Sequence, residues 1–565
     1  MPEFVTQCRG AMTWTLREEC AQWILDHVAD GLAAAEPPEG WELVKENNVR
    51  AIYTIPLADS PGSRGYLKRF KCRGVWERLK HMVAPSKAAA EWRTVNRLLD
   101  LGIPVPRPLA MAERRSGIGL TGESILLTEA VPDAAPLSDV LLKAGERARE
   151  DLLMKAAELV HLLHEKSCFH GDLHVGNILA VGPAGEARLV LLDLHRVRFK
   201  RALSQRDRIE NLAMLLTSMH TRAPEEDQWR FFFGRYADLE RLAPFEEGRE
   251  RGEWIVQITN RIMDIRRTRF RSRTKRCLIN SSGFAVEDRA GRRIFRKRAI
   301  PEDMLTQAID AHMGGRADRI KEGGASSVSR MEIAHEGKTI PICVKENRYG
   351  LLDMVKGLVR MSRGRRAWVG GNGLAIRGYE TCEMFGLVEE RFLGLVRRSF
   401  LVMEYLGEMK AIDRYAYEDV IGFPPKRRRA ITRALAAHFT ELEEAGVYHS
   451  DLKASNILVR EKEEDWAFFL VDLDSIRFPR RPQGFRAFRC QIRGLAQLNS
   501  ALRTTVTNAD RMRFFLHYLY GGQDVLRQGH RRDAFSRGIA RLVLKETAKR
   551  DCVWNRRGAE EAAHT

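Results

Sequence analysis

Long apolar runs are absent from this 565-residue sequence, and no segment approaches 18 consecutive apolar residues. A membrane-spanning helix needs about 20 such residues, so none is expected. The opening stretch, MPEFVTQCRGAMTW, also lacks the basic region and apolar run of a secretory signal. Cysteine is scarce. Its nine residues are scattered and form no CxxC pair, which argues against structural zinc and favours reduced thiols in a cytoplasmic protein.

Acidic residues are fewer than basic ones, since 75 Asp and Glu residues face 94 Lys and Arg residues and the net charge is +19. Basic residues concentrate in RRTRFRSRTKR (266–276), which has seven bases and no acid, and in KRRR (426–429). Such runs are typical of a solvated linker or helix face. They are also typical of contact with nucleic acid, an anionic membrane surface or a phosphorylated substrate. The sign of the charge does not choose among these.

One motif occurs twice. HGDLHVGNIL (170–179) is followed by an apolar run that ends in Asp193, and HSDLKASNILV (449–459) is followed by an apolar run that ends in Asp472. In both copies an Asn lies five residues after the first Asp, and the last Asp lies sixteen residues after the Asn. A strand-borne Lys precedes the first Asp by 104 residues in one copy and by 106 in the other. Matched spacing of this kind indicates two copies of one domain.

The flanking elements repeat in the same order. The first copy has a predicted strand, a helix and a buried strand, and the second copy has the same three elements in the same order. The helices align without a gap and share Ser, Trp, Asn, Leu and Gly positions. In pairs, these segments are 65–72 with 341–349, 86–102 with 362–378, and 124–131 with 399–406.

The repeat divides the chain into five expected parts. Apolar residues at helical spacing predict an amphipathic helix near residues 13–34, before the break AAAEPPEG. The parts are an N-terminal helical extension (1–35), a first domain (36–264), a basic linker (265–280), a second domain (281–550) and a C-terminal tail (551–565).

The repeated residue types suit phosphoryl transfer, in which catalysis is mostly positioning and charge neutralisation. Asp172 is predicted to be the base that accepts the proton of the attacking hydroxyl. Asn177 and Asp193 offer the hard oxygen ligands that Mg²⁺ prefers. Lys68 is predicted to reach the phosphates of a nucleotide, and Glu91, on the following helix, to hold that Lys extended. The neighbouring His of the motif is expected to order the loop rather than to act chemically.

The second copy offers the corresponding residues. Asp451 stands at the position of the base, and Asn456 and Asp472 stand at the metal positions. Lys345 stands at the position of the phosphate-binding Lys. Each residue alone has an ordinary structural interpretation, such as a surface Lys or a turn after a helix. The joint pattern, found twice, favours the functional one.

With these residues the two halves resemble the protein-kinase-like superfamily, and within it the Kdo/WaaP family of lipopolysaccharide core kinases. The segments YLKRF, SKAAAEW, HGDLHVGNIL and LLDLHRVRF carry the resemblance in the first half. VKENRYG, SRGRRAW, HSDLKASNILV and LVDLDSIRF carry it in the second half. The resemblance implies an α+β fold of two tandem bilobal kinase-like domains, each with a small antiparallel-sheet lobe and a mainly helical lobe. ATP and Mg²⁺ are the implied cofactors, with the nucleotide between the lobes.

Five further positions follow from the resemblance. The hinges between the lobes would lie near Thr128–Val131 and Glu404–Leu406, where Glu129 and Glu404 would contact the nucleotide. Gly323 and Gly324 would let the backbone of a loop approach phosphates, a feature for which the first copy has no glycine. Lys453 would meet the γ-phosphate as in protein kinases, whereas the first copy has a histidine there, as in aminoglycoside phosphotransferases.

The two copies differ at the helix that should hold the phosphate-binding Lys. The gapless alignment places Ala367 opposite Glu91, and the second helix also contains GGNG (370–373). Glycine in a helix costs about 1 kcal/mol relative to alanine. We therefore expect Lys345 to be less well held than Lys68 and the first copy to carry more of the catalysis.

The function implied by the resemblance is ATP-dependent phosphorylation of a heptose or Kdo hydroxyl of the lipopolysaccharide inner core, in the cytoplasm at the inner face of the inner membrane. The basic excess fits peripheral contact with an anionic membrane surface there. Two alternatives stay open: a protein or small-molecule (aminoglycoside-type) kinase of the same fold, and a tandem pseudokinase that acts as a scaffold. Nucleic acid is not an expected partner, and the sequence indicates no oligomeric state.

Overall fold

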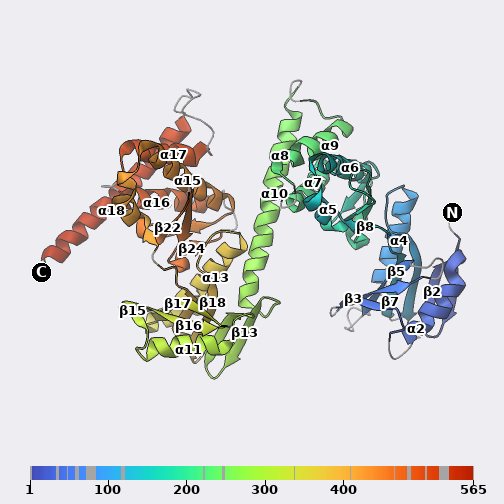
Figure 1. The fold of residues 1–565 in the computed structure, drawn as a ribbon, viewed down its shortest axis with the longest axis horizontal. Helices are drawn as coiled ribbons and strands as arrows, with labels where there is room; N and C mark the ends of the chain where they lie inside the picture. The colour runs from blue at the N-terminus through green and yellow to red at the C-terminus, as the bar shows by residue number, and fades with distance from the viewer. Residues whose placement is uncertain are drawn as a thin grey trace. The chain divides into compact units, whose positions relative to one another are not determined.

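The chain folds into two compact units. The computed structural model describes residues 3–33, 37–46, 49–57, 63–71, 84–115, 121–220, 223–244, 248–335, 337–407, 409–463, 465–479, 485–502, 506–520 and 534–563. The units are Met1–Ile265 and Arg266–Thr565, called domain 1 and domain 2 below. Each has a sheet-rich N-lobe followed by a mainly helical C-lobe (Figure 1), so the predicted α+β bilobal fold is confirmed.

The N-lobe of domain 1 is a seven-stranded antiparallel sheet with the strand order β1-β2-β6-β7-β5-β4-β3. One face packs on the helical residues 18–33, and the other packs on α4 (Lys87–Asp100). The strands are β1 (Phe4–Arg9), β2 (Met12–Arg17), β3 (Glu42–Glu46), β4 (Arg50–Pro56), β5 (Arg64–Lys71), β6 (Pro108–Arg115) and β7 (Thr121–Glu129).

The helix predicted over residues 13–34 is wrong in its first part. β1 and β2 form a hairpin at the edge of the sheet, and helical structure begins only at Glu18. Trp14 and Leu16 are buried and alternate with less buried threonines, which is the period of a strand rather than of a helix. The N-terminal segment is thus part of the sheet and core of domain 1. The helical residues comprise η1 (Glu18–Cys20), α1 (Ala21–Trp23), η2 (Ile24–Ala29) and α2 (Asp30–Ala33).

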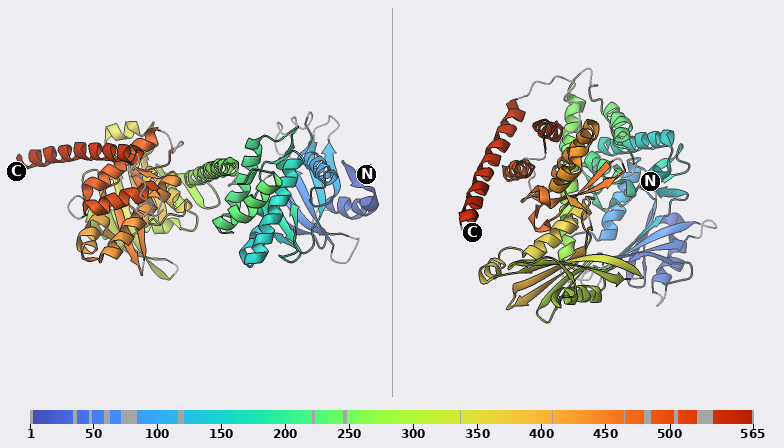
Figure 2. Two further views of the ribbon diagram at one scale, coloured as in Figure 1. Left: turned by 90° about the horizontal axis from the view of Figure 1, so that it is seen from above. Right: turned by 60° about the vertical axis from the view of Figure 1, so that its left-hand side comes forward.

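The N-lobe of domain 2 repeats this sheet strand for strand, in the order β13-β14-β18-β19-β17-β16-β15. Its edge hairpin has the same strand lengths as β1–β2. Figure 2 gives two further views of the sheet and of α11 (Glu302–Met313), which packs on it. The strands are β13 (Phe284–Arg289), β14 (Arg292–Lys297), β15 (Asp318–Lys321), β16 (Ser326–His335), β17 (Lys338–Arg348), β18 (Met384–Phe392) and β19 (Leu395–Glu404). The remaining helices of this lobe are α12 (Leu351–Lys356) and α13 (Arg363–Ile376).

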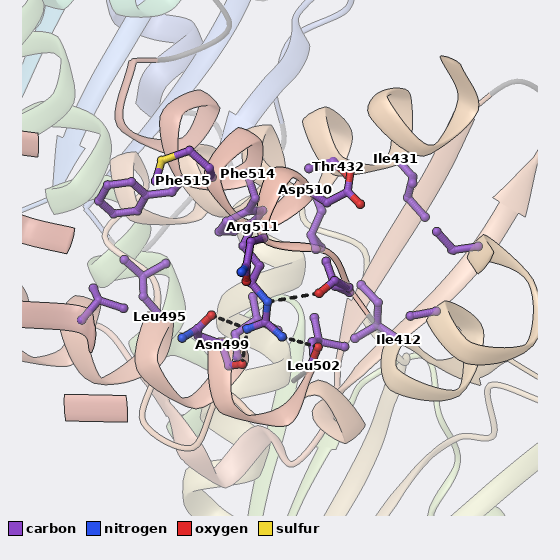
Figure 3. Close-up of a pocket in the computed structure, with 18 of the residues that line it drawn as sticks. Ile412, Ile431, Thr432, Leu495, Asn499, Leu502, Asp510, Arg511, Phe514 and Phe515 are labelled. Carbon is purple, nitrogen blue, oxygen red and sulfur yellow. Dashed lines mark hydrogen bonds between the residues drawn. The ribbon is translucent and has the colours of Figure 1, made fainter. Parts of the chain in front are cut away.

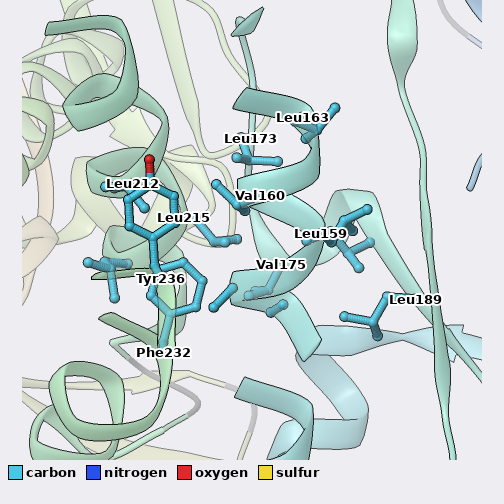
Figure 4. Packing of buried hydrophobic residues seen from close by; sticks show 14 of the residues in the cluster. Leu159, Val160, Leu163, Leu173, Val175, Leu189, Leu212, Leu215, Phe232 and Tyr236 are labelled. Atoms are coloured by element: carbon cyan, nitrogen blue, oxygen red, sulfur yellow. The ribbon is translucent and has the colours of Figure 1, made fainter. Parts of the chain in front are cut away.

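The C-lobe of domain 1 is held by one large apolar core. Leucines and valines of α6 (Glu146–Glu165) meet aromatic residues of the later helices, including Phe232 and Tyr236 (Figure 4). The other elements are β8 (Ala134–Pro136), α5 (Leu137–Lys143), β9 (Cys168–His170), η3 (Val175–Asn177), β10 (Ile178–Val181), β11 (Arg188–Leu191), η4 (Leu194–Arg196), β12 (Val197–Phe199), α7 (Gln205–Met219), α8 (Glu225–Asp227), η5 (Gln228–Phe233) and α9 (Gly234–Leu239).

The C-lobe of domain 2 has the same short strands around the repeated motif and a different set of later helices. The elements are β20 (Lys410–Ala411), α14 (Ile412–Glu418), η7 (Val420–Gly422), α15 (Pro425–Glu444), β21 (Tyr448–His449), η8 (Ala454–Asn456), β22 (Ile457–Lys462), β23 (Asp465–Leu470), η9 (Leu473–Ser475), β24 (Ile476–Arg477), α16 (Phe485–Ala501), α17 (Asn508–Tyr520) and α18 (Ala534–Ala563). The last helix continues beyond the expected domain end at residue 550.

A cavity of about 420 Å³ lies among α14, α15, α16, α17 and α18 (Figure 3). Its walls are mainly apolar, and Arg511 crosses it to donate hydrogen bonds to Asn499 and to the carbonyl oxygens of Leu502 and Val506. These bonds satisfy carbonyl groups at the end of α16. None of the residues of the repeated motif lines this cavity.

The basic run 266–276, expected to be a linker, lies at the end of α10 (Glu250–Lys275) and the start of η6 (Arg276–Leu278). Thr274 and Cys277 are buried within domain 2. The run is therefore a helical part of domain 2 with an exposed basic face. Among the helices of the described residues, none combines the length and apolarity needed to cross a bilayer.

Candidate active site

The repeated loop is fixed by its histidine in the same way in both domains. In domain 1 the His170 ring nitrogen Nε2 lies 3.3 Å from the carbonyl oxygen of Leu192, and Nδ1 accepts the backbone N–H of Asp172 at 3.1 Å. His449 makes the matching contacts with Val471 and Asp451. Burial lowers the pKa of His170 to about 4, so the ring is neutral at pH 7 and serves to position the loop.

Asn177 is tied to the loop by its amide nitrogen. Its Nδ2 donates to the carbonyl oxygen of Asp172 at 2.9 Å, and Asn456 donates to that of Asp451 at 2.8 Å. The five-residue spacing thus places the Asn side chain beside the Asp in each domain. Since the amide nitrogen is used in this way, the amide oxygen remains the atom suited to ligate a hard cation.

Asp193 and Asp472 have the same rare backbone conformation. Both adopt left-handed angles, with φ 55° and ψ 54° for Asp193 and φ 55° and ψ 51° for Asp472. Each comes shortly after a buried strand and begins a short helical turn. Non-glycine residues with positive φ are uncommon, and such conformations concentrate at functional sites.

Electrostatic surroundings keep Asp193 ionised. Burial raises the pKa of its carboxyl. This effect is outweighed by His195, whose Nδ1 lies 2.7 Å from Oδ1, and by the charges of Lys68 and Arg50. The pKa of Asp193 therefore lies below its usual value. A carboxylate that stays charged across the physiological range is suited to bind a cation.

The ion pair predicted in domain 1 is present. Lys68 Nζ on β5 lies 2.5 Å from Glu91 Oε1 on α4, and the Glu91 side chain is only 4% exposed. The helix begins at Ser86, whose hydroxyl accepts the backbone N–H of Ala89. This cap and the burial of Trp92 against the sheet fix α4 so that Glu91 faces Lys68.

Domain 2 holds its Lys differently. The structure places Ala367 at the position of Glu91, counted from the capping Ser362, and Lys345 Nζ lies 3.0 Å from Asp472 Oδ1 and 3.8 Å from Asp474 Oδ1. Lys345 lowers the pKa of Asp472 against the effect of burial, whereas burial and the adjacent Asp472 charge raise the pKa of Asp474. Lys345 therefore pairs with a residue expected to bind metal.

The glycines of α13 allow a close approach that α4 does not make. A Cβ atom on Gly370 would collide with the carbonyl oxygen of Leu473, and one on Gly373 would collide with the ring of Phe478. A Cβ on Gly371 would lie 2.8 Å from the sulfur of Met384. Besides their cost in helix propensity, the glycines therefore have a packing role that the sequence did not indicate, because the missing side chains let the helix pack directly on the segment after Asp472.

The remaining predicted residues lie where the resemblance placed them along the chain. Gly323 and Gly324 form the turn between β15 and β16. Glu129 and Glu404 end β7 and β19, and Glu404 accepts the backbone N–H of Glu383 at 3.0 Å. Lys453 Nζ lies 3.0 Å from Asp451 Oδ2. Their contacts with a nucleotide stay predictions.

The sequence assigned no role to two polar side chains near the proposed bases or to a carboxylate beside Lys345. Arg196 Nη1 lies 3.4 Å from Asp172 Oδ2, and Gln497 Nε2 donates to Asp451 Oδ1 at 3.1 Å. The carboxylate is that of Asp474, whose Oδ1 lies 3.8 Å from Lys345 Nζ. The first two come from a turn and a helix outside the motif, so local spacing carried no signal for them.

The donor set in each domain fits Mg²⁺ bound with a nucleotide. Asn177 with Asp193, and Asn456 with Asp472, each supply one amide oxygen and one carboxylate. In the described parts of the chain no group of three or more His, Cys, Asp or Glu side chains gathers as a metal cage. Mg²⁺ commonly takes only one or two protein ligands and completes its shell with phosphate oxygens and water.

Comparison with protein families gives one match, in two regions. Residues 42–236 and 378–518, together more than half of the chain, match the model of the lipopolysaccharide kinase (Kdo/WaaP) family. The first region includes Lys68, Glu91 and the motif of domain 1. The second includes the motif of domain 2 but begins after Lys345 and Ala367.

Curated relatives carry one activity in their names. A 3-deoxy-D-manno-octulosonic acid kinase of Haemophilus influenzae is 25% identical over 156 residues, which are 26% of this chain and 64% of that protein. The kinase of the same name from Pasteurella multocida is 26% identical over 195 residues, 32% of this chain and 79% of that protein. The chain thus spans just under two thirds of the Haemophilus proteins it matches. A solved structure of WaaP in complex with acyl carrier protein aligns with a TM-score of 0.34 and 19% identity, covering 44% of this chain and 97% of that one.

Proposed function

The chain belongs to the lipopolysaccharide kinase (Kdo/WaaP) family, and we propose that it transfers the γ-phosphoryl group of ATP to a heptose or Kdo hydroxyl of the lipopolysaccharide inner core. The names of the curated relatives support a Kdo acceptor. Low identity to those relatives leaves heptose as the second acceptor to test.

The observation that carries this proposal is the set of contacts around Asp172. A neutral buried His fixes the loop, Asn177 is tied to the Asp172 carbonyl, and Lys68 is held by a buried Glu91. The Asp172 side chain is 40% exposed, which leaves it open to an incoming sugar. Such pre-organised groups supply most of what phosphoryl transfer requires.

In the proposed reaction Asp172 orients the acceptor hydroxyl and takes its proton as the sugar oxygen bonds to the γ-phosphorus and the bond to ADP breaks. Lys68, held extended by Glu91, neutralises charge on the nucleotide phosphates. Asn177 and Asp193 would hold Mg²⁺, which when bound neutralises phosphate charge. Arg196, beside Asp172, is available to a negatively charged group of the acceptor.

The test is phosphate transfer by the full-length protein from labelled ATP, with Mg²⁺, to deacylated core oligosaccharides that end in Kdo or in heptose. Mass spectrometry of the product identifies the phosphorylated sugar. Transfer to either oligosaccharide supports the proposal and selects the acceptor.

Two other outcomes would contradict it. Turnover that ignores core sugar but responds to an aminoglycoside or to a protein substrate would point to another kinase of this fold. Failure to bind ATP at all, measured by calorimetry, would point to a scaffold.

A further inference from the structure

The short helix α12 and the turn after it present several highly exposed apolar side chains in domain 2. Leu351 is 82% exposed, Leu352 is 77%, Leu358 is 73% and Val359 is 91%. Single exposed leucines are ordinary on protein surfaces. Four within nine residues, with the exposed Val355 between them, form a continuous apolar segment that requires an explanation.

A second exposed apolar pair lies beside this segment. Phe392 and Leu393, at the turn between β18 and β19, are 63% and 87% exposed. The backbone N–H of Tyr349, which leads into α12, donates to the carbonyl oxygen of Arg397 near the start of β19. The strand pairing therefore brings the turn 392–394 and α12 to the same end of the sheet.

Basic residues surround these apolar side chains. Lys356, Arg360, Arg363 and Arg397 are exposed, and none of the four has an ion pair among the described residues. Asp353 is the only acid between residues 349 and 366. We call the segment 351–361, the turn 392–394 and these four cations the α12 patch.

We propose that the α12 patch is a docking surface for an anionic lipid bilayer. Apolar side chains rimmed by Lys and Arg suit the boundary between acyl chains and anionic headgroups. The leucines would enter the apolar layer while the cations meet lipid phosphates, each contributing roughly a fivefold gain in affinity. A second copy of the chain fits less well, because two such cationic patches would repel each other.

The α12 patch lies next to elements of the proposed active site of domain 2, so docking would bring that site to the bilayer. α12 connects β17, which carries Lys345, to α13, which packs on the segment after Asp472. This step rests on the proposed function, in which the acceptor sugar is attached to a lipid held in a bilayer. It also moves the expected membrane contact from the basic run 266–276, which has cations but no comparable apolar segment, to the α12 patch.

The first experiment measures binding of the full-length protein to sedimented vesicles of phosphatidylcholine, with and without phosphatidylglycerol, and uses neither ATP nor acceptor. The wild-type protein should bind the mixed vesicles and release them in part at high salt. Replacing Leu351 and Leu352 by Asp should lower the affinity at least about tenfold, since each buried leucine alone is worth that much. Lys356→Glu with Arg360→Glu should lower it at low salt and much less at high salt.

Three controls separate docking from other effects. Leu142→Asp changes a leucine of domain 1 that is 57% exposed and should leave binding unchanged. Arg269→Glu with Arg273→Glu removes exposed charge from α10 and should lower binding less than the α12 variants do. Thermal melting of every variant should match the wild type, because exposed positions carry little folding energy.

Activity distinguishes this inference from the proposed function. The Leu351/Leu352 variant should phosphorylate a deacylated acceptor as the wild type does, and lose turnover only on an acceptor embedded in vesicles. The inference is overturned if the wild type does not bind mixed vesicles, or if the α12 variants bind as well as it does. Loss of self-association in those variants, without any effect on vesicles, would make the patch a protein interface instead. None of these results would affect transfer to the deacylated acceptor.

Discussion

Domain 1 and domain 2 share a sheet order, a motif and the backbone angles of the last Asp, yet they hold the phosphate-binding Lys in different ways. Lys68 is paired with Glu91, a residue of the N-lobe helix. Lys345 is paired with Asp472, a proposed metal ligand of the C-lobe. In domain 1 the Lys is positioned without occupying the metal ligand. In domain 2 the Lys is instead paired with the proposed metal ligand. Binding of Mg²⁺ and nucleotide there would have to separate Lys345 from Asp472.

The helices behind the two Lys residues explain the difference. α4 buries a Glu side chain that reaches Lys68. α13 packs so closely on residues 473–478 that a Cβ atom at Gly370 or Gly373 would collide with Leu473 or Phe478. In domain 1 the helix α4 supplies the carboxylate that pairs with the Lys. In domain 2 the corresponding helix α13 supplies close packing on the C-lobe instead.

The largest expected effect is the loss of the base in domain 1. Asp172→Ala should lower phosphate transfer by about 10²–10⁴, the usual loss for a general base. Asp451→Ala should cost less than about tenfold, because we assign most of the transfer to domain 1. Initial rates at saturating ATP measure both, and Asp→Asn at each position is the matched control. Equal losses would indicate two working sites, and an unchanged rate in the double Ala variant would refute the assignment of the base.

Next in size is the loss of the Lys–Glu pair. Glu91→Gln leaves Lys68 poorly placed and should lower turnover by about 10². A cycle that combines Lys68→Met with Glu91→Gln should be strongly non-additive, since the two side chains act together. Lys345→Met should change the same rate much less. A larger loss from Lys345→Met than from Lys68→Met would reverse the order of the domains.

A stability measurement tests the glycine packing of α13. Gly370→Ala adds a methyl group against the Leu473 carbonyl and should destabilise domain 2 by about 1–3 kcal/mol. The matched position in α4 is Thr94, which is half-buried and donates to the carbonyl of Ala90. Thr94→Ala should change the free energy of unfolding by less than about 0.5 kcal/mol. Denaturant unfolding of the two full-length variants measures both changes. Equal losses of stability in Gly370→Ala and Thr94→Ala would contradict the close approach of α13 to Leu473.

The smallest expected effect is a pH dependence confined to domain 2. Burial raises the pKa of Glu443 to about 7, against the hydrogen bonds it accepts from Tyr518 and Gln491. The folded state then binds more protons than the unfolded state between pH 4.5 and 7, so stability falls as the pH rises through that range. Between pH 5.5 and 8 the loss is about 2 kcal/mol.

Glu443→Gln removes the titrating group and should flatten this dependence in calorimetry of the full-length protein. Buried histidines in both domains act in the opposite sense, since burial lowers the pKa of His164 in domain 1 to about 3 and that of His438 in domain 2 to about 4. These histidines make stability rise with pH up to about 6.5. A pH profile unchanged by Glu443→Gln would show that the carboxyl titrates normally.

The two-domain repeat, the bilobal fold and the contacts within the repeated loop could be predicted from the amino-acid sequence alone. Asp172, Asn177 and His170 contact one another within eight positions of the chain, so their spacing encodes their geometry directly. The Lys68–Glu91 pair was also predictable, because a strand and the helix after it form one supersecondary unit.

Other features depend on contacts between distant parts of the chain and could not be predicted in this way. The hairpin β1–β2 was mistaken for helix because its apolar residues satisfy both periods over a short stretch, and pairing with β6 selects the strand. The partner of Lys345 lies 127 positions away, and the need for glycine at 370 comes from a carbonyl more than 100 positions away. Local spacing fixes contacts made within one loop, whereas contacts between lobes depend on how closely two elements pack, and that distance is set by the whole core.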